Sequence, residues 1–234
     1  MPATLSPPPA PPATANGSSS LHQHAYEEIK RLIVTGEFPP DTFLSERQLA
    51  QRLGMSKTPV HIALKRIEAE GFVAISPQQG IVVRGLSPDD ILDHYELREA
   101  LEGFVVRRLA ARLDSVGTDA LRHALASQEK ALAEGDLARC LELDARFHLL
   151  LARLLGNRQI LAAMDQLHDR IRLVILRVGT LHRERFEESV PEHAAIVDHL
   201  LAGDSAAAET AMLEHLEAGK RRILLRRTEP HPEP

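Results

Sequence analysis

The chain of 234 residues has no tryptophan, two tyrosines and six phenylalanines, so that aromatic residues make up only 3% of it. Its apolar content is nevertheless 44%, enough for a sizeable core, and it comes mainly from alanine and leucine. This composition favours helices over sheets. The sequence also lacks an apolar run of 18 residues, so we expect no membrane-spanning helix. Its length allows one or two domains.

The single cysteine, Cys140, excludes an internal disulfide and fits a reducing cytosol, where we expect it to serve as a small apolar filler. The first 20 residues have neither a basic region nor an apolar one, and so do not form a secretory signal. Their content of Pro, Ala and Ser predicts a disordered tail over residues 1–20, and a second tail is expected over 226–234. A cytoplasmic location follows.

The most informative segment is residues 44–80, LSERQLAQRLGMSKTPVHIALKRIEAEGFVAISPQQG. Ser45 and Ser56 stand where two short amphipathic helices would begin, and each is a good N-cap residue. Gly54 supplies the turn between the helices, and Gly71 ends the second one. A V-A-I-S-P-Q-Q-G-I-V-V hairpin follows. This order of parts favours a winged helix-turn-helix, which presents one helix to the major groove of DNA, over an ordinary helical hairpin with a basic face.

Residues 21–85 resemble the DNA-binding domain of the GntR family of bacterial transcription regulators, whose pattern is close to L-S-E-R-x-L-A-x-x-L-G-V-S-R-T-P-V-R-x-A-L-x-x-L-x-x-E-G. Two departures occur at Lys57 and His61, where the family usually has arginine, and neither side chain has the forked pair of donors with which arginine contacts guanine. The resemblance implies that double-stranded operator DNA is contacted by residues of both motif helices and the wing tip, namely Arg47, Ser56, Lys57, Thr58, His61, Gln79 and Gly80.

The net charge of −5 is unevenly distributed along the chain. Residues 21–85 hold 8 Lys and Arg against 7 Asp and Glu, whereas residues 86–217 hold 15 against 24. The negative charge therefore belongs mostly to a second domain that need not approach phosphate. A nearly neutral DNA-binding domain predicts modest non-specific affinity and a need for a homodimer, because one module covers only one half-site.

Residues 86–225 have long helical periodicity and predict an all-helical bundle of six or seven helices. The fold class is therefore mainly α: an N-terminal winged helix-turn-helix followed by an all-helical bundle with room between its helices for a ligand. Breaks are expected at glycines such as Gly117 and Gly135. The helices are predicted near 88–113, 117–134, 136–155, 158–178, 184–202 and 204–225.

Four residues of the predicted bundle have the side chains of a metal site. Asp144 and His148 are four residues apart and so share one helix face, while His193 and His215 belong to the last two helices. Three imidazoles and one carboxylate could form the first shell of a divalent transition metal, and Zn, Ni and Mn all remain open. The alternative is that Asp144 and His148 are simply a surface pair.

The bundle resembles the FCD ligand-binding domain of the FadR-type branch of GntR regulators, over about residues 89–217. The matching motifs are D-x-x-F-H followed by G-N, then E-H-x-x-I, then a histidine on the last helix, which together include all four candidate ligands. The resemblance implies a pocket beside the metal for a small organic acid effector. Arg98 would bind its carboxylate, with Arg172 a weaker candidate. A surface ion pair between Arg98 and Glu102 is the equal alternative.

Three functions follow as hypotheses: a ligand-responsive transcription regulator, with repression the expected mode, a metal-dependent hydrolase using the Asp/His site, and a helical scaffold with structural histidines. The winged module favours the regulator, which is not an enzyme. The remaining bundle histidines match no ligand position and are expected to be surface or capping groups: His94, His123, His168, His182 and His199.

Overall fold

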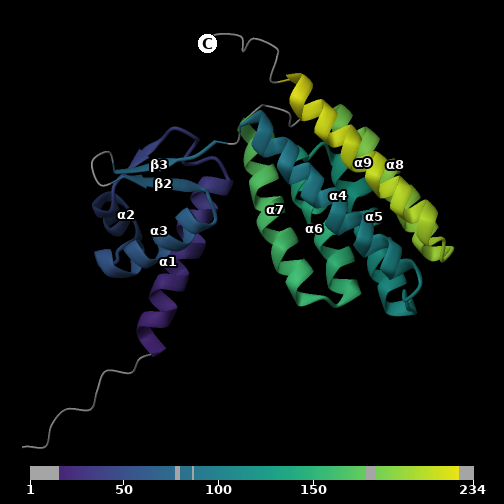
Figure 1. Cartoon of the computed structure of the whole chain (residues 1–234), viewed down its shortest axis with the longest axis horizontal. Helices are drawn as coiled ribbons and strands as arrows, with labels where there is room; N and C mark the ends of the chain where they lie inside the picture. Colours follow the sequence, from purple (N-terminus) through teal and green to yellow (C-terminus); the bar gives the residue numbers. More distant parts are fainter. Residues whose placement is uncertain (1–15, 77–79, 86, 178–182, 227–234) are drawn as a thin grey trace, which may run out of the picture.

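The computed structural model describes residues 16–76, 80–85, 87–177 and 183–226. Figure 1 shows two bodies, which we call the head and the bundle. The elements of the head are α1 (Asn16–Val34), β1 (Phe43–Leu44), α2 (Glu46–Leu53), α3 (Lys57–Ala69), β2 (Val73–Ser76) and β3 (Gly80–Val83). Those of the bundle are α4 (Pro88–Ala110), α5 (Ser115–Glu134), α6 (Leu137–Leu155), α7 (Arg158–Arg177), α8 (Arg183–Leu201) and α9 (Ser205–Arg226).

The head has the predicted winged helix-turn-helix architecture. Its three strands are antiparallel in the order β1-β3-β2, with Val73 opposite Val83 and Ile75 opposite Ile81 in the β2–β3 hairpin. One face of this small sheet packs on the three helices around a core that includes Ile29, Leu64, Ile67, Phe72 and Val83. The sheet and core hold α2 and α3 in a fixed relation.

Local signals set the ends of the motif helices. Ser45 caps α2, because its side chain accepts a hydrogen bond from the Gln48 amide, and Gly54 follows in the left-handed region at φ 64°. Ser56 stands at the N-cap of α3 as predicted, but its side chain makes no capping hydrogen bond. The two caps are therefore alike in sequence and different in strength.

The bundle contains six helices within the described residues, and their bounds lie within three residues of those predicted. Ser87 begins α4 with a capping box, in which its side chain and that of Asp90 bond each other's backbone amide. The break expected at Gly117 lies earlier. Asp114 caps α5 by accepting a hydrogen bond from the Gly117 amide at 2.8 Å, so Gly117 is inside the first turn of that helix.

The predicted tail of residues 1–20 needs one correction, because Asn16–Ser20 form the start of α1. Residues 1–15 and 227–234 lie outside the described residues, and Arg226 is the last residue of α9. None of the helices within the described ranges is long and apolar enough to cross a membrane.

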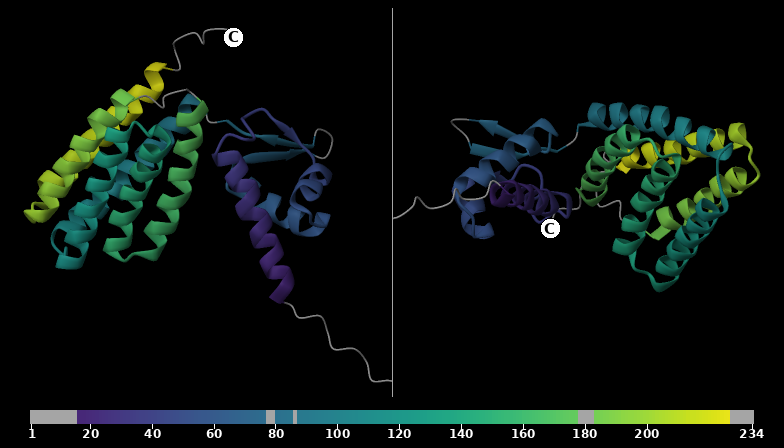
Figure 2. Two further views of the ribbon diagram at one scale, coloured as in Figure 1. Left: turned by 180° about the vertical axis from the view of Figure 1, so that it is seen from behind. Right: turned by 90° about the horizontal axis from the view of Figure 1, so that it is seen from below.

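Figures 1 and 2 show the bundle beside the head. Helices α4 and α9 pack along each other, α8 lies against α9, and α7 is the bundle helix that contacts α1 of the head. The core of the bundle is rich in aliphatic side chains from all six helices, with Phe147 as its one fully buried aromatic residue. Buried polar side chains interrupt this core, and several of them gather where α4, α6, α8 and α9 meet.

Candidate functional site

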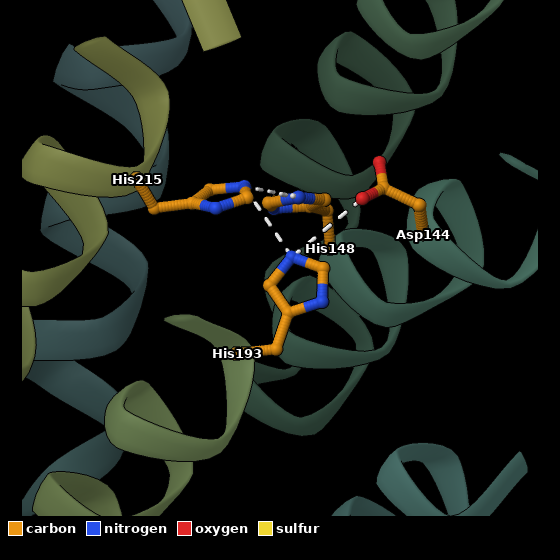
Figure 3. A group of neighbouring side chains, drawn as sticks. All are labelled: Asp144, His148, His193 and His215. Carbon is orange, nitrogen blue, oxygen red and sulfur yellow. Dashed lines mark hydrogen bonds and ion pairs between the residues drawn. The ribbon is translucent and has the colours of Figure 1, made fainter. Parts of the chain in front are cut away.

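The four predicted metal ligands converge inside the bundle (Figure 3). Asp144 and His148 extend from α6, His193 from α8 and His215 from α9. The Nε2 atom of His215 lies 3.2 Å from Nε2 of His148 and 3.3 Å from Nε2 of His193, and Asp144 Oδ1 lies 3.7 Å from His193 Nε2. All three histidines are buried, whereas Asp144 is half-buried at the edge of the cluster.

Two of the imidazoles are oriented through their Nδ1 atoms. His193 Nδ1 lies 2.9 Å from the amide oxygen of Gln128, whose amide nitrogen donates to the carbonyl of Leu143. His215 Nδ1 lies 2.7 Å from a carboxylate oxygen of Glu192. An oxygen acceptor at Nδ1 places the proton on that atom, so each Nε2 is left with a lone pair.

The third imidazole is oriented by a buried carboxylate. Glu102 of α4 is 1% exposed, and its Oε2 atom lies 2.5 Å from His148 Nδ1 in an ion-pair contact that is not aligned as a hydrogen bond. Its Oε1 atom accepts a hydrogen bond from Arg98 Nε at 2.6 Å. Burial alone would raise the pKa of Glu102, but Arg98 and His148 outweigh burial and hold the pKa well below its usual range. Glu102 is therefore a carboxylate.

This donor set fits a cation. Burial lowers the pKa of His193 and His215 well below the usual value, and the neighbouring histidine rings add to the effect, so both are neutral at pH 7. Their Nε2 lone pairs then face one another and repel unless a positive charge lies between them. Neighbouring ligands in a tetrahedral zinc site with bonds of roughly 2.0–2.1 Å would be about 3.3 Å apart. The observed separations of 3.2 and 3.3 Å agree with that value.

A second possible ligand set shares one member with the first. Glu102, His148 and His168 also lie close enough to hold an ion. The guanidinium of Arg98 already occupies Glu102, however, and its positive charge opposes a cation at that position. The set with Asp144 is therefore the better candidate for a metal site, and Glu102 contacts one of its histidines.

Two of the histidines expected at the surface are buried, so that expectation is wrong for them. His168 lies in the core, 3.7 Å from Glu102, and its ring stacks on His148 at 5.0 Å between centroids. His94 is buried near the start of α4, with Nδ1 2.8 Å from the carbonyl of Asp90. The residues next to them in the sequence did not indicate this burial, because the groups they contact lie on other helices or one helical turn earlier. His182 lies outside the described residues.

A cavity of about 60 Å³ opens beside the four candidate metal ligands. Asp144 and His215 form part of its wall, so a ligand in the cavity could reach a bound metal. Both predicted effector residues also line it. Arg98 is buried and paired with Glu102, so the ion pair and the pocket position are found together rather than as alternatives. Arg172 has a buried Nε atom without a hydrogen-bond partner.

Two further arginines of the cavity wall were not expected from the sequence. Arg185 of α8 bonds Glu192 at 3.1 Å, and Arg222 of α9 pairs with Glu188. Four arginines, together with the apolar side chains of the wall, make a pocket suited to a small anionic molecule with a hydrocarbon part.

The predicted DNA-binding residues within the described part of the head lie on its surface. Arg47 is exposed on α2, and Ser56, Lys57 and Thr58 are exposed at the N-terminal end of α3. Further along the same helix His61 is exposed, and its Nδ1 atom lies 2.7 Å from Glu46 of α2. This contact engages Nδ1 and leaves on Nε2 a lone pair that can accept a hydrogen bond from a base.

The wing carries the last two predicted residues. Gly80 is exposed at the start of β3 with φ 84°, and a Cβ added there would lie 3.3 Å from the carbonyl of Leu44. Glycine is therefore needed at this position for backbone reasons, whether or not it meets DNA. Gln79 lies outside the described residues.

Comparisons with known proteins agree with this division. A family model described as the FCD domain matches residues 93–218, and one described as bacterial regulatory proteins of the gntR family matches residues 21–83. An uncharacterized HTH-type transcriptional regulator in an unstable DNA locus of Streptomyces ambofaciens is 33% identical over 209 residues, 88% of this chain and 86% of the relative.

Two further matches are a repressor and a solved structure. The HTH-type transcriptional repressor GlaR of Escherichia coli K12 is 30% identical over 203 residues, which cover 82% of this chain and 90% of GlaR. A solved structure of a GntR transcriptional regulator from Rhodococcus sp. RHA1 is 26% identical with a TM-score of 0.76, covering 88% of this chain and 98% of that one. The relatives are transcription regulators rather than enzymes.

Proposed function

The chain belongs to the GntR family of bacterial transcription regulators that carry an FCD domain, and we propose that it represses transcription by binding operator DNA as a homodimer under control of a small organic acid. The observation that carries this proposal is a single chain holding both an exposed helix-turn-helix and a buried donor cluster that opens into an arginine-lined pocket. The head would supply the output, and the bundle would detect the ligand.

The DNA-binding step is assigned to the exposed ends of α2 and α3. Arg47 and Lys57 would contact phosphates or base edges, and Thr58 and His61 would add hydrogen bonds. A gel-shift titration against the DNA upstream of the chain's own gene tests this assignment. Arg47→Ala should weaken binding about tenfold, whereas Arg122→Ala, an exposed arginine of α5, should leave it unchanged. Equal affinities in all three proteins would contradict the assignment.

The homodimer would be formed through the bundle. Leu97 and Phe104, seven residues apart on α4, are 47% and 38% exposed, and Leu213 of the neighbouring α9 is 37% exposed. Large apolar side chains on adjacent helices are typical of an interface between subunits. Sedimentation equilibrium should give a dimer for the natural chain and a weakened dimer for Phe104→Glu. Val116→Glu, at a 73% exposed position of α5, is the control that should stay dimeric.

The metal would be held by Asp144, His148, His193 and His215. When bound, a divalent ion would neutralise the converging donors and offer an electrophilic partner to an effector carboxylate. Elemental analysis after dialysis should find about one ion per chain, and His148→Ala or His193→Ala should lose most of it. His123→Ala, an exposed histidine of α5, should retain the ion. Full occupancy in either ligand variant would exclude this site.

The effector would be a small organic acid bound between the metal and the arginines of the cavity wall. Arg172 is the best placed to meet it, because its Nε atom has no partner, whereas Arg98 is already balanced by Glu102. A thermal-shift series with mono-, di- and tricarboxylic acids tests the class. Stabilisation by an acid in the natural chain that is lost in Arg172→Leu supports the assignment, and neutral sugars acting equally well would contradict it.

The hydrolase alternative has less support. A zinc hydrolase needs a carboxylate free to act as a base beside the metal. The two nearest buried or half-buried acids beyond the ligand set are both engaged: Glu102 by Arg98 and His148, and Glu192 by Arg185 and His215. The relatives named above are regulators, which favours a sensing role for the same residues.

A further inference from the structure

One turn of α7 joins the bundle to the head through an ion pair. Asp169 Oδ2 lies 2.7 Å from Lys30 Nζ of α1. The same Lys30 nitrogen lies 3.0 Å from Glu70 at the end of α3 and 3.0 Å from the hydroxyl of Tyr26. The lysine side chain is only 11% exposed, so this contact is much less screened by water than a surface pair.

The next residue of α7 makes a second contact with the head. The guanidinium of Arg170 donates to the carbonyl of Glu70 and lies 5.7 Å from the ring centre of Phe72. Gly71, with φ 79°, allows this approach, because a Cβ at that position would lie 3.2 Å from the guanidinium carbon. The other side of the guanidinium faces the Nε2 atom of buried His94 on α4 at 3.5 Å.

The same turn faces the effector cavity with its other residues. His168, Ile171 and Arg172 line the cavity, and the last two follow His168 by three and four positions, so both lie near it on one side of α7. Asp169 and Arg170 lie between them in sequence and point to the head. Five consecutive residues of one rigid helix thus contact the cavity on one side and the DNA-binding head on the other, next to α1 (Figures 1 and 2).

We propose that residues 168–172 of α7 are the coupling element of this protein, in which Asp169 and Arg170 clamp the head and respond to occupancy of the cavity through His168, Ile171 and Arg172. The inference rests on the proposed function in one respect: it takes the cavity and the candidate metal ligands beside it as the place where the effector binds. A ligand that draws Arg172 or His168 inward would rotate or shift the turn. Because a helix is stiff, the clamp residues would move with it.

The place of the clamp determines what it would control. It contacts α1 and the C-terminal end of α3, whereas Lys57 and Thr58 are at the N-terminal end of α3, about 18 Å away along the axis of a helix of this length. Occupancy of the cavity would therefore change the orientation of the head relative to the bundle and leave its DNA-contacting side chains intact. In a dimer, such a change would alter the spacing of the two heads.

Hydrogen–deuterium exchange on the full-length, metal-free protein tests whether the clamp exists. Asp169→Asn should speed exchange at the amides of Gly71 and Phe72 by about threefold or more, because the head loses its partner on α7. Asp165→Asn is the matched control: it removes the same charge from an exposed position one turn earlier on α7. Unchanged exchange in Asp169→Asn, or equal effects of both variants, would overturn the clamp.

Addition of Zn²⁺ to the same proteins tests the coupling. In the natural chain we expect slower exchange around His148, His193 and His215, together with a change of at least twofold at Gly71 and Phe72. In Asp169→Asn the bundle should respond as before, and the head should respond by less than half as much. A bundle that responds while the head of the natural chain does not would overturn the coupling.

A bundle with no response to Zn²⁺ would contradict the proposed metal site, not the clamp. The first comparison decides about the clamp without any metal. Arg170→Leu provides a second variant for both experiments, because it removes the contact with Glu70 and leaves the Lys30–Asp169 pair in place. If Arg170→Leu and Asp169→Asn both show the exchange rates of the natural chain, residues 168–172 are not the coupling element.

Discussion

The candidate site of the head and that of the bundle place their charged side chains in opposite ways. In the head, the candidate DNA-binding residues Arg47, Lys57 and His61 are exposed, and the contact of His61 with Glu46 lies at the surface. In the bundle, Arg98 and Glu102 are almost completely buried and satisfy each other. A binding surface of the first kind can change residue by residue without affecting stability, whereas a buried network of the second kind links sensing to the stability of the fold.

The buried pair of α4 should give the largest effect. Glu102→Leu leaves the Arg98 charge buried without its partner, so we expect the bundle to lose about 3 kcal/mol of unfolding free energy. Glu99 is on the same helix as Glu102 and pairs with Lys220 of α9 in a more exposed place. Glu99→Leu breaks that pair and should lower the unfolding free energy by less than about 1 kcal/mol.

The chain offers a convenient measurement for this prediction. It has no tryptophan and one tyrosine in each body, Tyr26 in the head and Tyr95 in the bundle. Urea unfolding followed by tyrosine fluorescence in a Tyr26→Phe background therefore reports on the bundle alone. Equal costs for the two substitutions would mean that burial of the Glu102 pair has no consequence for stability.

The second prediction concerns pH. Burial holds the pKa of His168, His193 and His215 well below the usual value, which is about 6.5 in an unfolded chain. Below pH 6.5 the unfolded state therefore binds more protons than the folded state, and the stability of the metal-free bundle must fall as the pH falls. Each such histidine contributes up to about 1.4 kcal/mol per pH unit.

Urea unfolding between pH 5 and pH 7.5, in the presence of a chelator, measures this slope. His168→Gln should reduce the slope by about one proton, whereas His123→Gln, at an exposed position of α5, should leave it unchanged. A bundle equally stable at both ends of the range would show that these histidines are not buried in neutral form.

The same contrast explains what could be predicted from the sequence. The motif helices, the wing and the pair Asp144–His148 depend on residues within a few positions of one another, so their spacing predicted them. Other parts of the structure join helices that are far apart in the sequence but adjacent in space. Examples are the contacts of Glu102 and Gln128 with the histidines and that of Arg170 with Glu70. Such partners leave no periodic signal. The i, i+4 relation of Arg98 and Glu102 was visible, but its burial was not.

The third prediction concerns the surface of the head. Lys57→Ala should weaken binding to the upstream DNA about fivefold and reduce its salt dependence by about one charge, with no change in stability, because Lys57 is exposed at the start of α3. Lys130→Ala, which removes an equally exposed lysine from α5, is the control. Fluorescence anisotropy at several salt concentrations measures both quantities. A loss of stability in Lys57→Ala would contradict the contrast, because it would mean that an exposed charge of the head contributes to folding as a buried charge of the bundle does.

The smallest expected effect separates two serines within the head. Ser45 accepts a hydrogen bond from the Gln48 amide, whereas Ser56 occupies the same position before α3 without making such a bond. Ser45→Ala should therefore lower the stability of the head by about 1 kcal/mol and Ser56→Ala by less than about 0.5 kcal/mol. Tyrosine fluorescence in a Tyr95→Phe background measures the head alone. DNA affinity should follow the opposite order. A larger loss of affinity in Ser56→Ala than in Ser45→Ala would mean that the Ser56 hydroxyl, which does not cap its own helix, bonds to DNA instead. The reverse order in stability would mean that the two caps have been assigned the wrong way round.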